Sequence, residues 1–284
     1  ISLLCYYFVT VLTTVSVKKI LKMGGVSNMC EIYYGTLWAA GAKWVYNRAQ
    51  AKEAAADMVG ERVIDEATSD ERFENRYDAG MQLAGLLKPY QDDDVVVLGI
   101  PRGGVVTAAG VARGLWAPLD IILVKKIIYP ADPECALGAE VDGQKPYYRN
   151  ADRGVGADSE WLDQAEQMAY QEIERRRAAY YGDYHRAVAL KGKTVILVDD
   201  GMATGLSMEA AAWAVRKQQP ARVIVAVPVA SPESVAELET VADKVVVLSD
   251  PQLFMGAVSR HYDSFDQVDD AEVERVLWDA DDEV

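Results

Sequence analysis

Two adjacent aspartates, Asp199 and Asp200, follow directly on the apolar run VILV at 195–198. Like charges side by side repel each other, so the pair is costly unless a ligand or a cation uses it. Ionised carboxylates accept hydrogen bonds from neighbouring hydroxyl groups, such as the two free hydroxyls of a ribose. The pair therefore predicts a sugar-binding site, and the alternative that needs no ligand is a helix N-cap preceded by an acidic strand end.

The next residues, GMATGLS at 201–207, have the features of a phosphate-binding turn. Gly201 and Gly205 let the backbone approach a ligand closely, and Thr204 and Ser207 add hydroxyl groups. The backbone amides from residue 203 onward enter a predicted helix, whose N-terminus favours an anion. The turn has neither the Gly-Lys-Ser/Thr of a Walker A loop nor a GxGxxG fingerprint, so it does not support a nucleoside triphosphate or dinucleotide site.

Strands and helices alternate from about residue 66 and predict an α/β fold, a mostly parallel open sheet flanked by helices. The expected strands are 95–100, 119–124, 194–198, 222–229 and 244–250. The expected helices are 72–90, 105–116, 158–181, 206–218, 232–242 and the acidic tail, in which Val273, Val276 and Leu277 face inward. The first helix should turn one side to the core, formed by Phe73, Tyr77, Met81, Leu83, Ala84 and Leu87. A Pro/Gly-rich loop is expected over 129–146.

Ligands of open α/β sheets bind beyond the carboxyl ends of the strands. Three segments with unusual composition are expected at such ends, and they cover 101–104, 125–144 and 199–207. Their convergence predicts a single binding site more strongly than any one of them does.

The net charge of −15 argues against binding to nucleic acid, because an acidic surface repels a phosphate backbone. Three cysteines, Cys5, Cys30 and Cys135, have no metal-like spacing, and two histidines, His185 and His261, give little material for a histidine-based centre. A reducing, cytoplasmic setting is expected. Residues 1–65 are interpreted as an N-terminal extension, which is either an over-extended start, a fragment, a membrane anchor formed by the uncharged residues 1–17, or a buried element.

The stretch VILVDDGMATGLSM, 195–208, resembles the signature of type I phosphoribosyltransferases, except that Gly201 stands where an aliphatic residue is common. Four further blocks extend the resemblance to a group of predicted phosphoribosyltransferases of bacteria and archaea, namely RYDAGMQLA (76–84), LGIPRGGVV (98–106), PECALGAE (133–140) and HYDSFDQVDDAEV (261–273). In that group the residues after PRGG are usually Val-Pro-Val, whereas Val105, Val106 and Thr107 stand here. The resemblance implies a domain of this family over 66–284, with a core sheet and a small hood.

The resemblance assigns roles to the residues. Asp199 and Asp200 would hold the ribose 2′- and 3′-hydroxyls of phosphoribosyl pyrophosphate. The 5′-phosphate would be bound by Ala203, Thr204, Gly205, Leu206 and Ser207, after Gly201. The pyrophosphate loop would be formed by Pro101, Arg102, Gly103 and Gly104, with Arg102 as a candidate catalytic residue. A non-proline cis peptide is expected at Arg102–Gly103, and a plain strand–helix turn is the alternative.

Lys125 or Lys126 would supply positive charge to the departing pyrophosphate from a loop that closes over the reacting centre, unless the two lysines simply end a strand. Mg²⁺ is implied as the cofactor, held by pyrophosphate and ribose oxygens and water, so that no metal-ligand motif is expected in the chain. Glu134 and Glu140 in the same loop receive no role.

The implied activity is transfer of a phosphoribosyl group from phosphoribosyl pyrophosphate to a base or amine, with release of pyrophosphate. The acceptor would lie under the hood, for which 66–90 and 251–278 are the candidates. Phe254, Tyr262 and Phe265 are expected to pack there rather than stack on a base, and His261 to be structural. The alternatives are a non-catalytic phosphoribosyl pyrophosphate sensor and an α/β enzyme of phosphatase type whose aspartates bind a metal. Small-molecule substrates, a possible homodimer and no membrane partner complete the expectations.

Overall fold

The computed structural model describes residues 72–128, 136–149, 159–182 and 187–281. The expected extension over 1–65 and its boundary with the domain lie outside these residues and remain predictions. The same is true of the three cysteines, Glu134 and His185.

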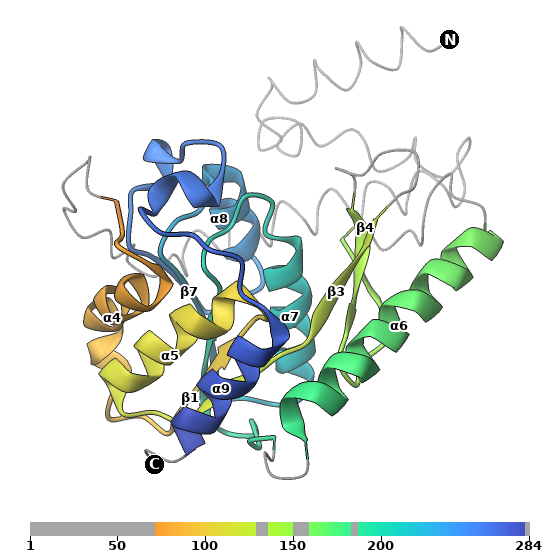
Figure 1. Cartoon of the computed structure of the whole chain (residues 1–284), viewed down its shortest axis with the longest axis horizontal. Coiled ribbons are helices and arrows are strands. Elements are labelled where there is room, and N and C mark those ends of the chain that lie inside the picture. Colours follow the sequence, from red (N-terminus) through yellow and green to blue (C-terminus); the bar gives the residue numbers. More distant parts are fainter. Residues whose placement is uncertain (1–71, 129–135, 150–158, 183–186, 282–284) are drawn as a thin grey trace, which may run out of the picture. The chain divides into compact units, whose positions relative to one another are not determined.

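A five-stranded, fully parallel sheet forms the centre of the fold, in the order β2-β1-β6-β7-β8 (Figure 1). Its strands are β1 (Val95–Gly99), β2 (Leu119–Ile121), β6 (Thr194–Val198), β7 (Arg222–Val227) and β8 (Lys244–Val247). β1 and β6 are buried along their whole length, which explains why they read as uninterrupted apolar runs in the sequence. The sheet confirms the predicted fold class.

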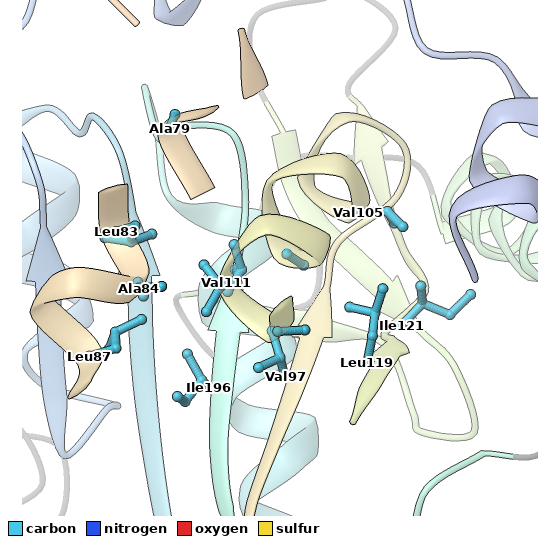
Figure 2. Close-up of a cluster of buried hydrophobic side chains, with 14 of the residues drawn as sticks. Ala79, Leu83, Ala84, Leu87, Val97, Val105, Val111, Leu119, Ile121 and Ile196 are labelled. Atoms are coloured by element: carbon cyan, nitrogen blue, oxygen red, sulfur yellow. The ribbon is translucent and has the colours of Figure 1, made fainter. Parts of the chain in front are cut away.

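Helices cover both faces of this sheet. One face carries α4 (Arg76–Leu87), α5 (Gly103–Leu115) and α9 (Asp270–Asp281), and the other carries α7 (Leu206–Lys217) and α8 (Pro232–Leu238). Figure 2 shows side chains of α4 and α5 pointing toward those of the strands on the first face. The residues labelled there are Ala79, Leu83, Ala84, Leu87, Val97, Val105, Val111, Leu119, Ile121 and Ile196.

The buried face of α4 agrees with the prediction at Leu83, Ala84 and Leu87 and differs from it at Tyr77 and Met81. Tyr77 and Met81 are 44% and 40% exposed, and the buried side is formed by Ala79, Gly80, Leu83, Ala84 and Leu87. The reason is the close approach of α4 to α5. A Cβ on Gly80 would lie 2.1 Å from the carbonyl oxygen of Thr107. Gly80 therefore lies on the line of contact between the helices, and the side chains of Tyr77 and Met81 lie outside it.

A second, antiparallel sheet lies where the sequence predicted the end of a strand and a loop. It has the order β3-β4-β5, with β3 (Val124–Ile128), β4 (Ala136–Val141) and β5 (Tyr147–Tyr148). The predicted strand 119–124 is therefore two strands, and part of the predicted loop 129–146 is β4. The helix α6 (Ser159–Tyr181) contacts β3 and β4 on one face, and α7 contacts them on the other.

The chain after β8 forms two short helical turns, η2 (Pro251–Leu253) and η3 (Val258–His261), before α9. Another such turn, η1 (Lys88–Tyr90), follows α4. In the terminal helix α9, Val273 and Leu277 are buried and Val276 is partly buried, as predicted. Among the helices of the described segments, none is both long and apolar enough to span a membrane.

Candidate active site

The acidic pair lies at the carboxyl end of β6 and packs directly against the first residues of α5. A Cβ on Gly103 would lie 2.1 Å from Oδ2 of Asp200, and a Cβ on Gly104 would lie 2.7 Å from Oδ1 of Asp199. Only residues without a side chain leave room for both carboxylates here. The segments 101–104 and 199–207 therefore converge, as the sequence predicted.

The PRGG turn differs from its prediction in one detail and leaves its arginine directed elsewhere. The non-proline cis peptide is Pro101–Arg102 and not Arg102–Gly103. The side chain of Arg102 is directed toward α9, where Nη1 lies 3.9 Å from Oδ1 of Asp270. The same carboxylate accepts a hydrogen bond from Tyr180 and pairs with Arg175. In this arrangement the backbone of the turn, rather than the Arg102 side chain, faces the acidic pair.

Burial and mutual repulsion act on both aspartates. Burial, and next the charge of Asp200, raise the pKa of Asp199 well above its usual range, and Lys126 and Arg76 offset only part of this. Burial also raises the pKa of Asp200, whose hydrogen bond with Arg76 opposes the shift. Two ionised carboxylates at these positions are therefore energetically unfavourable by themselves, and hydroxyl donors or cations would lower this energy.

Arg76, at the beginning of α4, is a partner of this pair that sequence reasoning missed. Its Nε donates to Oδ2 of Asp200 over 2.7 Å, and its Nη1 donates to the backbone oxygen of Asp266 over 2.7 Å. Its guanidinium carbon lies 3.6 Å from the centre of the Phe265 ring. One signal was available, because a cation in the first turn of a helix opposes the helix dipole and needs another reason to be there.

Aromatic residues of the C-terminal segment support the same region. Tyr262 is 2% exposed, packs between Phe73 and Phe265, and donates its hydroxyl to the backbone oxygen of Asp200 over 2.6 Å. Burial lowers the pKa of His261, which accepts a hydrogen bond from the amide of Met255. Tyr262 and His261 therefore pack, as predicted.

The turn after the aspartates is held at the start of α7 by contacts with α8. Gly205 has a φ of 69°, a conformation that favours glycine, and it caps α7. The Ser231 hydroxyl donates to the backbone oxygen of Ala203 over 2.9 Å. Ala203 and Thr204 are exposed and accessible, whereas Gly205 and Leu206 are buried, so that Leu206 has only its backbone to offer a ligand. Ser207 is half-buried.

Arg149, which directly follows β5, fixes this turn from the antiparallel sheet. Its guanidinium donates to the backbone oxygen of Thr204 over 2.8 Å and forms a two-pronged pair with Glu209 over 2.7 and 2.9 Å. Glu209 is 3% exposed and also accepts from Tyr147. Sequence reasoning missed this support, because Arg149 is far from residue 204 along the chain and lies between the predicted loop 129–146 and the predicted helix 158–181.

The two candidate lysines project from opposite faces of β3. Nζ of Lys126 lies 3.4 Å from Oγ1 of Thr204, on the side of the acidic pair. Lys125 faces Glu140 across the β3–β4 register, on the side of α6. Both lie in a strand and not in the predicted loop, and only Lys126 is brought to the site.

Glu140 is a buried carboxyl on β4 outside the acidic pair. Burial, and next the charge of Glu166 on α6, raise its pKa to about 7. A carboxyl whose pKa is raised on folding stabilises the fold at low pH, and this stability is lost as the pH rises from about 4.5 to about 7.

We therefore expect Glu140→Gln to be more stable than the unmodified protein at pH 8, by about 1–2 kcal/mol, with the difference disappearing below about pH 4.5. Thermal unfolding across this pH range checks it. A constant difference at every pH would show that Glu140 does not carry the raised pKa.

The two departures from the resembled pattern have different structural settings. A Cβ on Gly201 would lie 2.6 Å from a methyl group of Val258 and 2.7 Å from one of Val229. The valine side chains thus fill the space of the aliphatic residue that is common at this position. Thr107 lies inside α5, away from the pair, and its buried hydroxyl has no hydrogen-bond partner among the described residues.

Residues 74–263 match the model of the phosphoribosyl transferase domain. A Mycobacterium tuberculosis H37Rv protein, named provisionally as phosphoribosyl transferase Rv0571c, is 40% identical over 202 residues, which are 71% of this chain and 45% of that protein. The chain thus spans about half the length of the curated relatives it matches. The crystal structure of TT1426 from Thermus thermophilus is similar with 45% identity and a TM-score of 0.64, and covers 73% of this chain and 98% of that one.

Proposed function

Because this chain belongs to the phosphoribosyl transferase domain family, we propose that it transfers a phosphoribosyl group from phosphoribosyl pyrophosphate to a base or amine. The observation that carries the proposal is the position of the acidic pair. Asp199 and Asp200 lie against the start of α5 and directly precede the turn that begins α7. Two helix N-termini suit two anionic groups, and two carboxylates between them suit the sugar that joins those groups.

In this proposal the chain binds the donor at three places. The carboxylates of Asp199 and Asp200 accept hydrogen bonds from the ribose 2′- and 3′-hydroxyls. Backbone amides of the turn 203–207 and the hydroxyls of Thr204 and Ser207 bind the 5′-phosphate. Backbone amides of the turn 101–104 bind the pyrophosphate.

The reaction breaks the bond between the anomeric carbon and a pyrophosphate oxygen, and the electron pair leaves with pyrophosphate. A nitrogen of the acceptor forms the new bond from the opposite face of the sugar, and its proton passes to solvent or to the released anion. The chain contributes positioning and charge neutralisation rather than a covalent nucleophile. Such a mechanism does not need a histidine, so the small number of histidines in the chain does not argue against it.

The described residues are compatible with Mg²⁺ bound through the substrate. They contain no cluster of three or more His, Cys, Asp or Glu side chains that could hold a metal by themselves. An ion held by pyrophosphate and ribose oxygens and water needs no such cluster, and it would supply positive charge to the leaving group.

Lys126 provides a matched test within one strand. We expect Lys126→Met to lower kcat/KM by about 10–100-fold, because its ammonium group lies beside Thr204 of the phosphate-binding turn and also acts on Asp199. Lys125→Met, on the opposite face of β3, should leave kcat/KM nearly unchanged. Steady-state kinetics of pyrophosphate release measures both, and equal losses would contradict this assignment.

The function is tested by incubating the protein with phosphoribosyl pyrophosphate, Mg²⁺ and a panel of bases and amines while following pyrophosphate release. Release that depends on one acceptor is the expected result. Binding without release for every acceptor would point to a sensor, and no binding at all would reject both the transferase and the sensor.

The pairing of Arg76 with Asp200 argues against two aspartates that bind a metal directly. The cytoplasmic location and the homodimer remain predictions.

A further inference from the structure

Arg76 links the acidic pair to the segments that we expect to form the hood. It belongs to the first turn of α4, and its guanidinium contacts Asp200, the backbone of Asp266 and the ring of Phe265. The Arg76 and Asp200 side chains are only 11% and 17% exposed. Nε of Arg76 would also lie 2.8 Å from a Cβ on Gly103, so it reaches the pyrophosphate-side turn as well.

The two aspartates differ in the cations available to them. Among the described residues, Arg76 is the one cation within ion-pair distance of either carboxylate, and it pairs with Asp200. Asp199 forms no ion pair with Lys126 or Arg76, whose charges act on it from a distance. Burial and the charge of Asp200 therefore have the larger effect on the pKa of Asp199. In the described part of the chain, the remaining titratable group facing the pair is Tyr262, whose pKa is raised by burial and by Asp200.

We propose that Arg76 is a positioning residue for the donor site, which holds Asp200 ionised and in a fixed orientation so that its carboxylate accepts a ribose hydroxyl. This proposal rests on the proposed function. According to this proposal, ribose binding by the acidic pair depends on α4 and on residues 265–266, which are distant in sequence from β6. The charge-assisted hydrogen bond over 2.7 Å restrains Asp200 from one side and leaves its other lone pairs for the ligand.

Removing the guanidinium leaves two buried carboxylates side by side without an adjacent cation. The pKa of Asp200 then rises further, and the pair retains a proton to a higher pH than in the unmodified protein. A protonated carboxyl is a poorer acceptor, so ribose binding weakens at neutral pH and recovers as the pH rises. If the role of Arg76 were purely structural, its removal would weaken binding to the same extent at every pH.

The test is calorimetric titration of phosphoribosyl pyrophosphate with Mg²⁺ into the full chain between about pH 7 and pH 9, comparing Arg76→Met, Arg76→Lys and the unmodified protein. We expect Arg76→Met to bind at least ~10-fold more weakly at pH 7, with a ratio to the unmodified protein that approaches one at the upper end. Arg76→Lys should lie between the two. The matched control is Arg72→Met, which removes a half-exposed arginine bonded to Arg260 and Asp263 and should leave binding unchanged.

A loss that is the same at every pH, or no loss, would overturn the proposal. A second readout without the donor separates it from the proposed function. Thermal stability of Arg76→Met should fall more steeply than that of the unmodified protein as the pH rises from about 5 to about 8. The reason is that a carboxyl whose pKa is raised on folding stabilises the fold only at pH values below that pKa. If the unmodified protein fails to bind phosphoribosyl pyrophosphate, the proposed function fails, while the steeper slope still supports the ionic role of Arg76. Equal slopes reject that role.

Discussion

Asp199→Asn and Asp200→Asn are expected to lower the affinity for phosphoribosyl pyrophosphate alike, by ~100-fold or more, yet to change the stability of the ligand-free protein in opposite directions. Each substitution removes an ionised acceptor of a ribose hydroxyl. Asp199 has no cation in direct contact among the described residues, so its removal relieves burial and repulsion. Asp200 pairs with the buried Arg76, so its removal leaves that charge without a partner.

We therefore expect Asp199→Asn to gain about 1 kcal/mol of stability at neutral pH and Asp200→Asn to lose about 1–3 kcal/mol. The gain should vanish at low pH, where Asp199 is protonated and uncharged in the unmodified protein. A carboxyl whose pKa is raised on folding destabilises the fold only at pH values above that pKa. Thermal unfolding with and without donor measures both effects. The control is Asp92→Asn, an exposed carboxyl before β1 that should change neither. Equal destabilisation by both variants would contradict the proposed electrostatics of the pair.

Gly103→Ala is the second large effect we expect. The added methyl group would lie 2.1 Å from Oδ2 of Asp200 and 2.8 Å from Nε of Arg76, so the carboxylate must move. Displacement of a group that positions the reacting sugar costs about 100-fold in kcat/KM. Pyrophosphate-release kinetics measures this loss, and circular dichroism shows whether the fold is retained.

Gly85→Ala is the matched control for that substitution. Gly85 also lies in a helix, α4, but a Cβ there would meet nothing within 4 Å. This variant should keep full activity and gain about 0.5–1 kcal/mol of stability, because alanine favours a helix. An active Gly103→Ala variant would mean that Asp200 is not held at the start of α5 as described.

The central sheet could be predicted because its inner strands are buried on both faces. β1 and β6 read as short apolar runs between turn signals, a pattern that is typical of parallel strands. The antiparallel sheet could not be predicted in the same way. β3 contains Lys125 and Lys126, which face opposite sides, so neither periodicity nor apolar content indicated a strand.

The wrong assignment of Tyr77 and Met81 to the buried face of α4 has a similar origin. A periodicity argument ranks positions by their apolar side chains, and it gave Tyr77 and Met81 to the core. The real contact with α5 runs through Gly80, where the absence of a side chain lets the backbones approach. Which glycine serves such a contact depends on the partner helix, and that information is not local in the sequence.

For the candidate site, the sequence indicated the loops but not their supports. The convergence of the PRGG turn with the acidic pair followed from the rule that ligands bind at the carboxyl ends of parallel strands. Arg76 and Arg149 come from segments far away along the chain, and their contacts with Asp200 and Thr204 depend on tertiary packing. The ligand-binding roles of the site residues remain predictions.

The most direct test of the central claim is a crystal structure of the chain with phosphoribosyl pyrophosphate and Mg²⁺. The expected result places the ribose 2′- and 3′-hydroxyls in hydrogen-bond contact with Asp199 and Asp200, the 5′-phosphate on the turn 203–207, and the pyrophosphate on the turn 101–104. Donor bound elsewhere, or a metal ion coordinated directly by both aspartates with no ribose between the two turns, would contradict the account.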